Sequence, residues 1–97
     1  MIIRIVKMTF DQQRTDEFLN IFDESKQLIR AMKGCSRLEL LNDINSPNIY
    51  FTYSYWNSEN DLDNYRNSAL FADVWTRTKV LFSAKAEAWS VEQKIVL

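Results

Sequence analysis

Two stretches of this sequence alternate like β-strands but carry apolar side chains on both of their alternating sets. Residues 2–9 place two isoleucines on one set and an isoleucine, a valine and a methionine on the other. Residues 49–56 place four large apolar or aromatic side chains on one set and a tyrosine and a tryptophan on the other. An antiparallel sheet usually packs one face on a core and leaves the other in water. The sheet built from these strands therefore needs cover on both faces, and one layer of helices covers only one.

Helix and turn signals lie between these two strands. After residue 15, apolar residues recur at steps of three and four up to Gly34, which predicts an amphipathic helix closed by a glycine in the left-handed conformation. Residues 35–42 alternate as another strand. Residues 43–48 are turn-forming and include the only proline, so we expect a hairpin loop that joins this strand antiparallel to residues 49–56.

The second half of the chain completes a known order of elements. Ser58 and Asp61 have the spacing of a capping box, which predicts a helix from about Glu59, and Ser68 can cap a second helical segment. Residues 85–97 predict a long closing strand whose apolar end can reach a neighbouring chain. The order strand, helix, strand, strand, helix, strand predicts an α+β, ferredoxin-like βαββαβ fold, with a four-stranded antiparallel sheet and helices on one face. We expect residues 1–97 to form one such domain.

The composition predicts self-association. With 46% hydrophobic and 13% aromatic residues, the 97-residue chain has more apolar side chains than the thin core of so small a domain needs. The face of the sheet that no helix covers can be buried against the same face of a second copy. We therefore expect a homodimer in which two sheets pack face to face as a dimeric α/β barrel.

Several classes of function are disfavoured by what the sequence lacks. It has no histidine, one cysteine and one glycine, so the usual zinc and haem sites, histidine-dependent nucleophiles and glycine-rich nucleotide loops have no residues to form them. The net charge of -1, without a basic stretch, argues against a nucleic-acid partner. No apolar run approaches the roughly 20 residues of a membrane span. We expect a cytoplasmic protein with no metal, cofactor, nucleic-acid or membrane partner, in which Cys35 is a small buried hydrophobe.

Large aromatic rings gather between residues 53 and 82. Rings on a strand end and on the helices that cover it can line a pocket for a flat ligand, and they can equally pack a core. For the set Trp56, Tyr65, Phe71 and Trp75, the two interpretations are evenly balanced on sequence alone. The charged residues that can face such a pocket are Arg4, Arg66 and Arg77, and the phenolic ones are Tyr53, Tyr55 and Tyr65. For each arginine, a solvated surface position is the ordinary expectation.

One pattern of residues runs through nearly the whole chain. It comprises Gly34-Cys35, Leu38-Glu39-Leu40, Tyr55-Trp56-Asn57-Ser58-Glu59, Leu62, Tyr65-Arg66-Asn67-Ser68, Phe71, Trp75, Lys79, Phe82 and Lys85-Ala86-Glu87-Ala88-Trp89. This pattern resembles the antibiotic biosynthesis monooxygenase domain family, which includes quinol monooxygenases and belongs to the dimeric α/β barrel superfamily. The resemblance implies the same ferredoxin-like dimeric barrel that the strand and helix order predicts.

The resemblance also implies a function, a cofactor-independent monooxygenase that oxidises a small phenolic, quinol or anthrone-type substrate with dioxygen. In such enzymes the substrate loses a proton and passes an electron to dioxygen, while the protein binds a flat ring, stabilises its anion and excludes water. Thr52 stands where some members have an asparagine. Carried over to this chain, the resemblance makes Trp56 and Arg77 the predicted catalytic residues. The predicted substrate-binding residues come from the aromatic cluster itself and are Tyr53, Tyr65, Phe71 and Trp75.

Other functions of related folds fit the sequence less well. Haem-degrading relatives use a histidine on the second helical segment, where this chain has Trp75, and Tyr65 stands where they have a haem-contacting tryptophan. RNA-recognition domains share the order of elements, but their strand motif needs a glycine and a basic residue that are missing here. The alternative that the sequence does not separate from an oxygenase is a non-catalytic dimer of the same fold that binds a small aromatic ligand.

Overall fold

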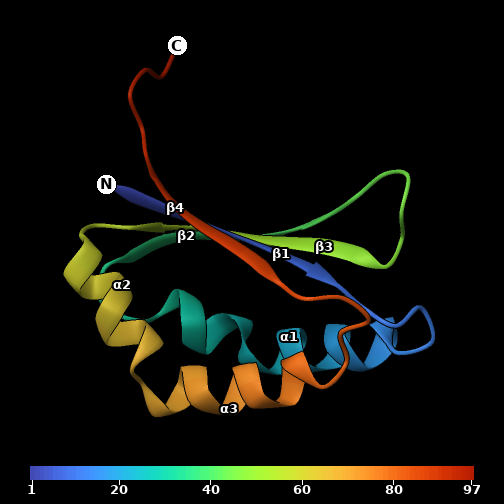
Figure 1. Ribbon diagram of the computed structural model, residues 1–97. Coiled ribbons are helices and arrows are strands. Elements are labelled where there is room, and N and C mark those ends of the chain that lie inside the picture. Colours follow the sequence, from blue (N-terminus) through green and yellow to red (C-terminus); the bar gives the residue numbers. More distant parts are fainter.

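The computed structural model describes all 97 residues as one four-stranded antiparallel sheet with three helices on a single face (Figure 1). The strands lie in the order β2-β3-β1-β4. This is the predicted α+β, ferredoxin-like βαββαβ fold, with its second helical region divided into two helices. The elements are β1 (Ile2–Thr9), α1 (Thr15–Arg30), β2 (Cys35–Asn42), β3 (Ile49–Trp56), α2 (Glu59–Arg66), α3 (Ala69–Lys79) and β4 (Glu87–Glu92).

The strand register decides which side chains meet under the helices. Arg4 of β1 pairs with Ser54 of β3 on one side and with Ser90 of β4 on the other. Because side chains alternate along a strand, Val6 shares the helix-facing side of β1 with Arg4, and Thr52 shares that side of β3 with Ser54. The middle of the sheet therefore presents small and polar groups, together with one arginine, to the helix layer.

The core is divided between the two ends of the sheet. One cluster contains Met8 and the fully buried Phe10, which stacks on Phe18 of α1 with 4.3 Å between ring centroids. The other contains Cys35, Leu62 and the fully buried Trp56. Met8 pairs with residue 50 and Trp56 pairs with residue 2, so the clusters lie at opposite ends of the β1 and β3 pair. Burial raises the pKa of the Cys35 thiol, in keeping with its predicted packing role.

The predicted helix starts are confirmed by their caps. The backbone N–H of Asp61 donates to the hydroxyl of Ser58 at 3.2 Å, and that of Phe71 donates to the hydroxyl of Ser68 at 3.1 Å. The first helix is shorter than predicted. It ends at Arg30, and a tightened turn in which the N–H of Met32 bonds to the carbonyl of residue 29 leads to Gly34, whose φ is +84°.

The last strand is also shorter than the predicted 85–97. Glu92 pairs with Ile2, the first residue of β1, so residues 93–97 have no strand beside them. Ile95, Val96 and Leu97 are exposed and extend away from the sheet (Figure 1). None of the helices combines the length and the apolar composition that crossing a bilayer requires.

Candidate functional site

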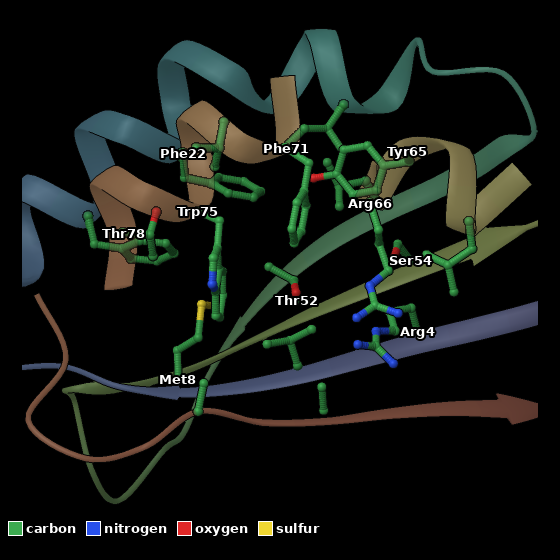
Figure 2. Close-up of a pocket in the computed structure, with 18 residues that line it drawn as sticks. Arg4, Met8, Phe22, Thr52, Ser54, Tyr65, Arg66, Phe71, Trp75 and Thr78 are labelled. Atoms are coloured by element: carbon green, nitrogen blue, oxygen red, sulfur yellow. The ribbon is translucent and has the colours of Figure 1, made fainter. Parts of the chain in front are cut away.

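A cavity of about 350 Å³ lies between the sheet and the helices, in the space that the two core clusters leave open (Figure 2). Its volume falls in the range of roughly 300–1,000 Å³ that small-molecule sites occupy. Of its 18 lining residues, 13 are hydrophobic. The lining residues are Arg4, Val6, Met8, Phe18, Phe22, Ile29, Leu38, Thr52, Ser54, Leu62, Tyr65, Arg66, Phe71, Val74, Trp75, Thr78, Ala86 and Ala88.

Three aromatic rings from the second helical region form one wall of this cavity. Phe71 and Trp75 are one turn apart on α3, and their planes are nearly parallel, at 8°, with centroids 6.0 Å apart. Tyr65 at the end of α2 meets Phe71 edge-on at 5.3 Å. All three rings are half-buried, so they present flat apolar surface to the cavity. Such a wall suits a planar aromatic ligand.

Polar groups gather at one end of the cavity, where Figure 2 shows Arg4, Arg66 and Ser54 close together. Arg4 is half-buried and donates from Nη1 to the Ser90 hydroxyl at 3.0 Å, whereas Arg66, the last residue of α2, is exposed. No carboxylate forms an ion pair with either guanidinium. Partial burial, and then the positive charge of Arg66, lower the pKa of Arg4. This end of the cavity is therefore positively charged and lacks a counter-charge from the protein.

Trp56 lies behind the cavity wall and hydrogen-bonds to Ser54, one of the polar groups at this end of the cavity. Its indole Nε1–H donates to the Ser54 hydroxyl at 2.9 Å, and its ring stacks on Tyr65 with centroids 5.0 Å apart. Trp56 itself is fully buried and does not line the cavity. Because the Ser54 oxygen accepts this bond, its own O–H proton can be donated to a ligand. Trp56 is thus placed to orient Ser54 rather than to touch a bound ring.

A second polar group lies at the opposite end of the cavity. Thr78 of α3 is 3% exposed, and its hydroxyl has no hydrogen-bond partner. Figure 2 shows it far from Arg4 and Arg66. An unsatisfied buried hydroxyl costs about 1–3 kcal/mol, which a ligand with a hydrogen-bonding group can recover. The cavity therefore has unpaired polar groups at both ends and apolar surface between them.

A comparison with known protein families matches residues 1–76 to antibiotic biosynthesis monooxygenase. The matched segment includes the cavity-lining parts of β1, β2, β3 and α2 and most of α3. The chain belongs to the antibiotic biosynthesis monooxygenase family. No curated protein sequence matches it.

Solved structures share the fold of this family member over its full length. A conserved protein from Methanosarcina mazei Go1 superposes with a TM-score of 0.91 at 20% identity, over 97% of this chain and 94% of its own. An antibiotic biosynthesis monooxygenase gives 0.92 at 15% identity, over 98% of this chain and 100% of its own. Rv0793 from Mycobacterium tuberculosis gives 0.90 at 14% identity, over 98% of this chain and 96% of its own. At these identities the likeness establishes the fold alone.

The structure brings together three of the six site residues predicted from the sequence. Tyr65, Phe71 and Trp75 line the cavity, and Trp56 lies directly behind it. Their roles in binding or catalysis stay predictions. Two residues that sequence reasoning did not single out, Ser54 and Thr78, also line the cavity. Ser54 lies two residues before Trp56 on the same side of β3. The alternation of side chains along a strand could therefore have indicated that Ser54 faces the helices together with Trp56.

Arg77 and Tyr53 lie elsewhere in this member of the family. Arg77 is exposed on α3, where it pairs with Glu24 at 2.9 Å and with Asp73 at 3.6 Å, and the hydrogen bond with Glu24 raises its pKa. Tyr53 is on the sheet face away from the helices, 5.5 Å from the ring of Tyr55. Neither residue lines the cavity. The arginines that line the cavity are Arg4 and Arg66.

The buried phenol of Tyr65 should make stability depend on pH in the alkaline range. Burial raises its pKa to about 12, so above pH 10 the unfolded chain releases this proton while the folded chain retains it. The free energy of unfolding therefore falls as the pH rises from 10 towards 12. Between pH 9 and pH 11, wild type should lose about 1 kcal/mol relative to Tyr65→Phe in urea unfolding. Parallel pH profiles for the two proteins would contradict this account.

Proposed function

We propose that this family member is a cofactor-independent monooxygenase that oxidises a small phenolic, quinol or anthrone-type aromatic substrate with dioxygen. The observation that carries the proposal is the cavity, which combines a wall of parallel rings with an unneutralised pair of arginines at one end. The rings suit a planar substrate, and the positive end suits the anion that forms when such a substrate loses its proton.

The chemistry requires the protein to stabilise an anion rather than to supply electrons. The substrate loses a proton, its anion gives one electron to dioxygen, and the resulting radical and superoxide combine to form a peroxide. The O–O bond then breaks. One oxygen atom stays on the substrate as a carbonyl, and the other leaves as water with the hydrogen of that carbon and the proton released first. For a hydroxyarene, substrate and dioxygen thus give a quinone and one water molecule.

The lining residues indicate how the first proton leaves. The cavity contains no carboxylate, and the chain has no histidine, so no ordinary general base faces the substrate. Tyr65, with a pKa of about 12, stays protonated near neutral pH. The two guanidiniums and the Ser54 O–H instead lower the pKa of the bound substrate by stabilising its anion. The proton then leaves to water at the exposed Arg66 end.

Oxygen uptake tests the proposal directly. Purified protein should accelerate oxygen consumption with members of a panel of naphthols, quinols and anthrones above the spontaneous rate. With ¹⁸O₂, one labelled atom should enter the organic product and one should enter water. Thr52→Phe, which fills the cavity floor, should remove the acceleration while thermal unfolding shows that the fold is retained. If wild type accelerates none of these reactions but still binds aromatic ligands, the protein is the non-catalytic binding dimer instead.

We further propose that the protein is a homodimer formed through the open face of the sheet. All three helices lie on the other face (Figure 1). The open face carries bulky side chains in adjacent strands, including the Tyr53 and Tyr55 pair and the exposed Trp89 and Val91. Burying so large an apolar surface against a second copy would stabilise the dimer.

A lysine at the centre of the open face should prevent this association. Wild type should have twice the 11.5 kDa chain mass in light scattering at micromolar concentration, and Tyr53→Lys should have the mass of one chain. Desolvating an unpaired ammonium at an interface is strongly unfavourable. The matched control is Ile44→Lys, which places the same charge at a loop residue that is 95% exposed and should leave the dimer intact. A monomeric wild type would contradict the proposal.

A further inference from the structure

The charges of the cavity exceed what a single phenolate would neutralise. Arg4 and Arg66 are the only charged residues among the 18 that line it, so the cavity carries two positive charges and no negative one. A phenol that has lost its proton supplies one negative charge. A ligand with a permanent negative group near the same position would balance the second.

The two guanidiniums are arranged to receive a group with two acceptor oxygens. They come from different elements, β1 and the end of α2, and Figure 2 shows both at the Ser54 end of the cavity. They are near enough for the charge of Arg66 to lower the pKa of Arg4. Arg4 is held at Nη1 by the Ser90 hydroxyl at 3.0 Å, which fixes the guanidinium and leaves its other N–H groups free. No protein carboxylate takes the available donors of either arginine. Planar forks of this kind bind carboxylates through two parallel hydrogen bonds.

We infer that the cavity binds an aromatic acid, with its carboxylate between Arg4 and Arg66 and its ring against Phe71 and Trp75. The inference rests on the proposed function in one respect, which is that the hydroxyl to be oxidised lies beside this carboxylate. Its developing anion then shares the same two guanidiniums and the Ser54 O–H. The binding of the acid itself does not depend on any reaction.

Binding of unreactive probes tests the inference separately from catalysis. We would titrate the protein with 2-naphthoate, which has no hydroxyl, and with 2-naphthamide, its neutral counterpart of the same shape. Calorimetry gives the affinities, and a change of tryptophan fluorescence that is lost in Trp75→Phe reports that the ring has reached the cavity wall. We expect wild type to bind the acid about 10–100-fold more tightly than the amide, as charge-assisted hydrogen bonds contribute this much.

Substitutions of Arg4 and Arg66 test whether these two residues cause the preference for the acid over the amide. Arg4→Gln and Arg66→Gln should each reduce the ratio of acid to amide affinity, and the double variant should bring it close to one while the amide still binds. Lys79→Gln, which removes a positive charge from exposed α3 surface outside the cavity, should leave the ratio unchanged. Equal affinities in wild type, failure of wild type to bind either probe, or a preference that persists in the double variant would each overturn the inference. The comparison of acid and amide affinities in wild type tests the inference even if a variant does not fold.

Reactive counterparts separate this inference from the proposed function. Oxygen uptake is compared for 3-hydroxy-2-naphthoate and 2-naphthol, which differ only in the carboxylate. Faster oxidation of the acid supports both proposals. Tight binding of 2-naphthoate without oxygen uptake would support the acid site and contradict the proposed monooxygenase. Oxygen uptake with naphthols but no preference for acids would support the monooxygenase and contradict the acid site.

Discussion

Arg4→Met is expected to reduce the kcat/KM of oxygen uptake by about 100- to 1,000-fold, the range found when a preorganised donor to a developing anion is lost. Methionine retains an unbranched apolar side chain, so the substitution removes charge and donors with little change of volume. Arg4 is half-buried at the polar end of the cavity, where a charge acts through less water than at the surface. With a substrate that carries no carboxylate, such as 2-naphthol, the loss should therefore fall mainly on kcat, because the anion forms only after the substrate has bound.

Arg77→Met is the matched comparison for this experiment. The same change at Arg77 breaks exposed ion pairs with Glu24 and Asp73, which contribute little to stability because water and salt screen them. Oxygen uptake should stay within about twofold of wild type because the residue does not line the cavity. A large loss with Arg77→Met and none with Arg4→Met would return the catalytic assignment to the residue favoured by the family resemblance. Thermal unfolding of both variants shows whether the lost Arg4 to Ser90 bond alters the fold.

The fold was predictable because the sequence shows the two-residue period of β-strands and the three-and-four spacing of an amphipathic helix. Alternation predicts the strand 35–42, and a β-branched and aromatic run after a turn predicts the strand 49–56. Their bounds agree with β2 and β3, and serine caps mark the starts of α2 and α3. The end of β4 was not predictable in the same way. Residues 95–97 are as apolar as a strand, but strand formation depends on a partner, and β1 begins opposite Glu92.

The site was predicted less well, because its geometry depends on small rotations. Successive residues of a helix differ by about 100°, so Arg77 points to solvent while its neighbour Thr78 is buried at the cavity. If the match to a family pattern is shifted by one residue, the predicted site residue changes from the exposed Arg77 to the buried Thr78. Whether aromatic rings fill a core or line a cavity depends on how far α3 stands from the sheet. Phe10 and Trp56 fill space, whereas Phe71 and Trp75 leave it open, although all four are large rings.

Gly34→Ala is expected to cause a large loss of stability, although it adds only one methyl group. Gly34 has a φ of +84°, a conformation that costs a residue with a Cβ atom about 1–2 kcal/mol. A Cβ atom built there would overlap the side chain of Asp61, which receives a hydrogen bond from the Ser58 hydroxyl at the start of α2. Moving Asp61 away would weaken this cap by about 1 kcal/mol more. We therefore expect a total loss of about 2–3 kcal/mol in urea unfolding and a Tm lower by about 10 °C or more.

A double-mutant cycle separates the two causes of this loss. In an Asp61→Gly background the overlap is relieved, because the Cβ, Cγ and Oδ2 atoms of Asp61 that a Cβ at position 34 would meet are all absent. Gly34→Ala should then cost at least about 1 kcal/mol less than in wild type, leaving the cost of the positive φ. Additive effects of the two substitutions would show that the close approach contributes nothing. Gly34 also accepts a hydrogen bond at its carbonyl from the N–H of Asn57 at 2.8 Å, immediately after Trp56. Strain at Gly34 is therefore transmitted to the residue that orients Ser54. Activity of the single variant should fall at temperatures well below its Tm, and the Asp61→Gly background should restore part of it.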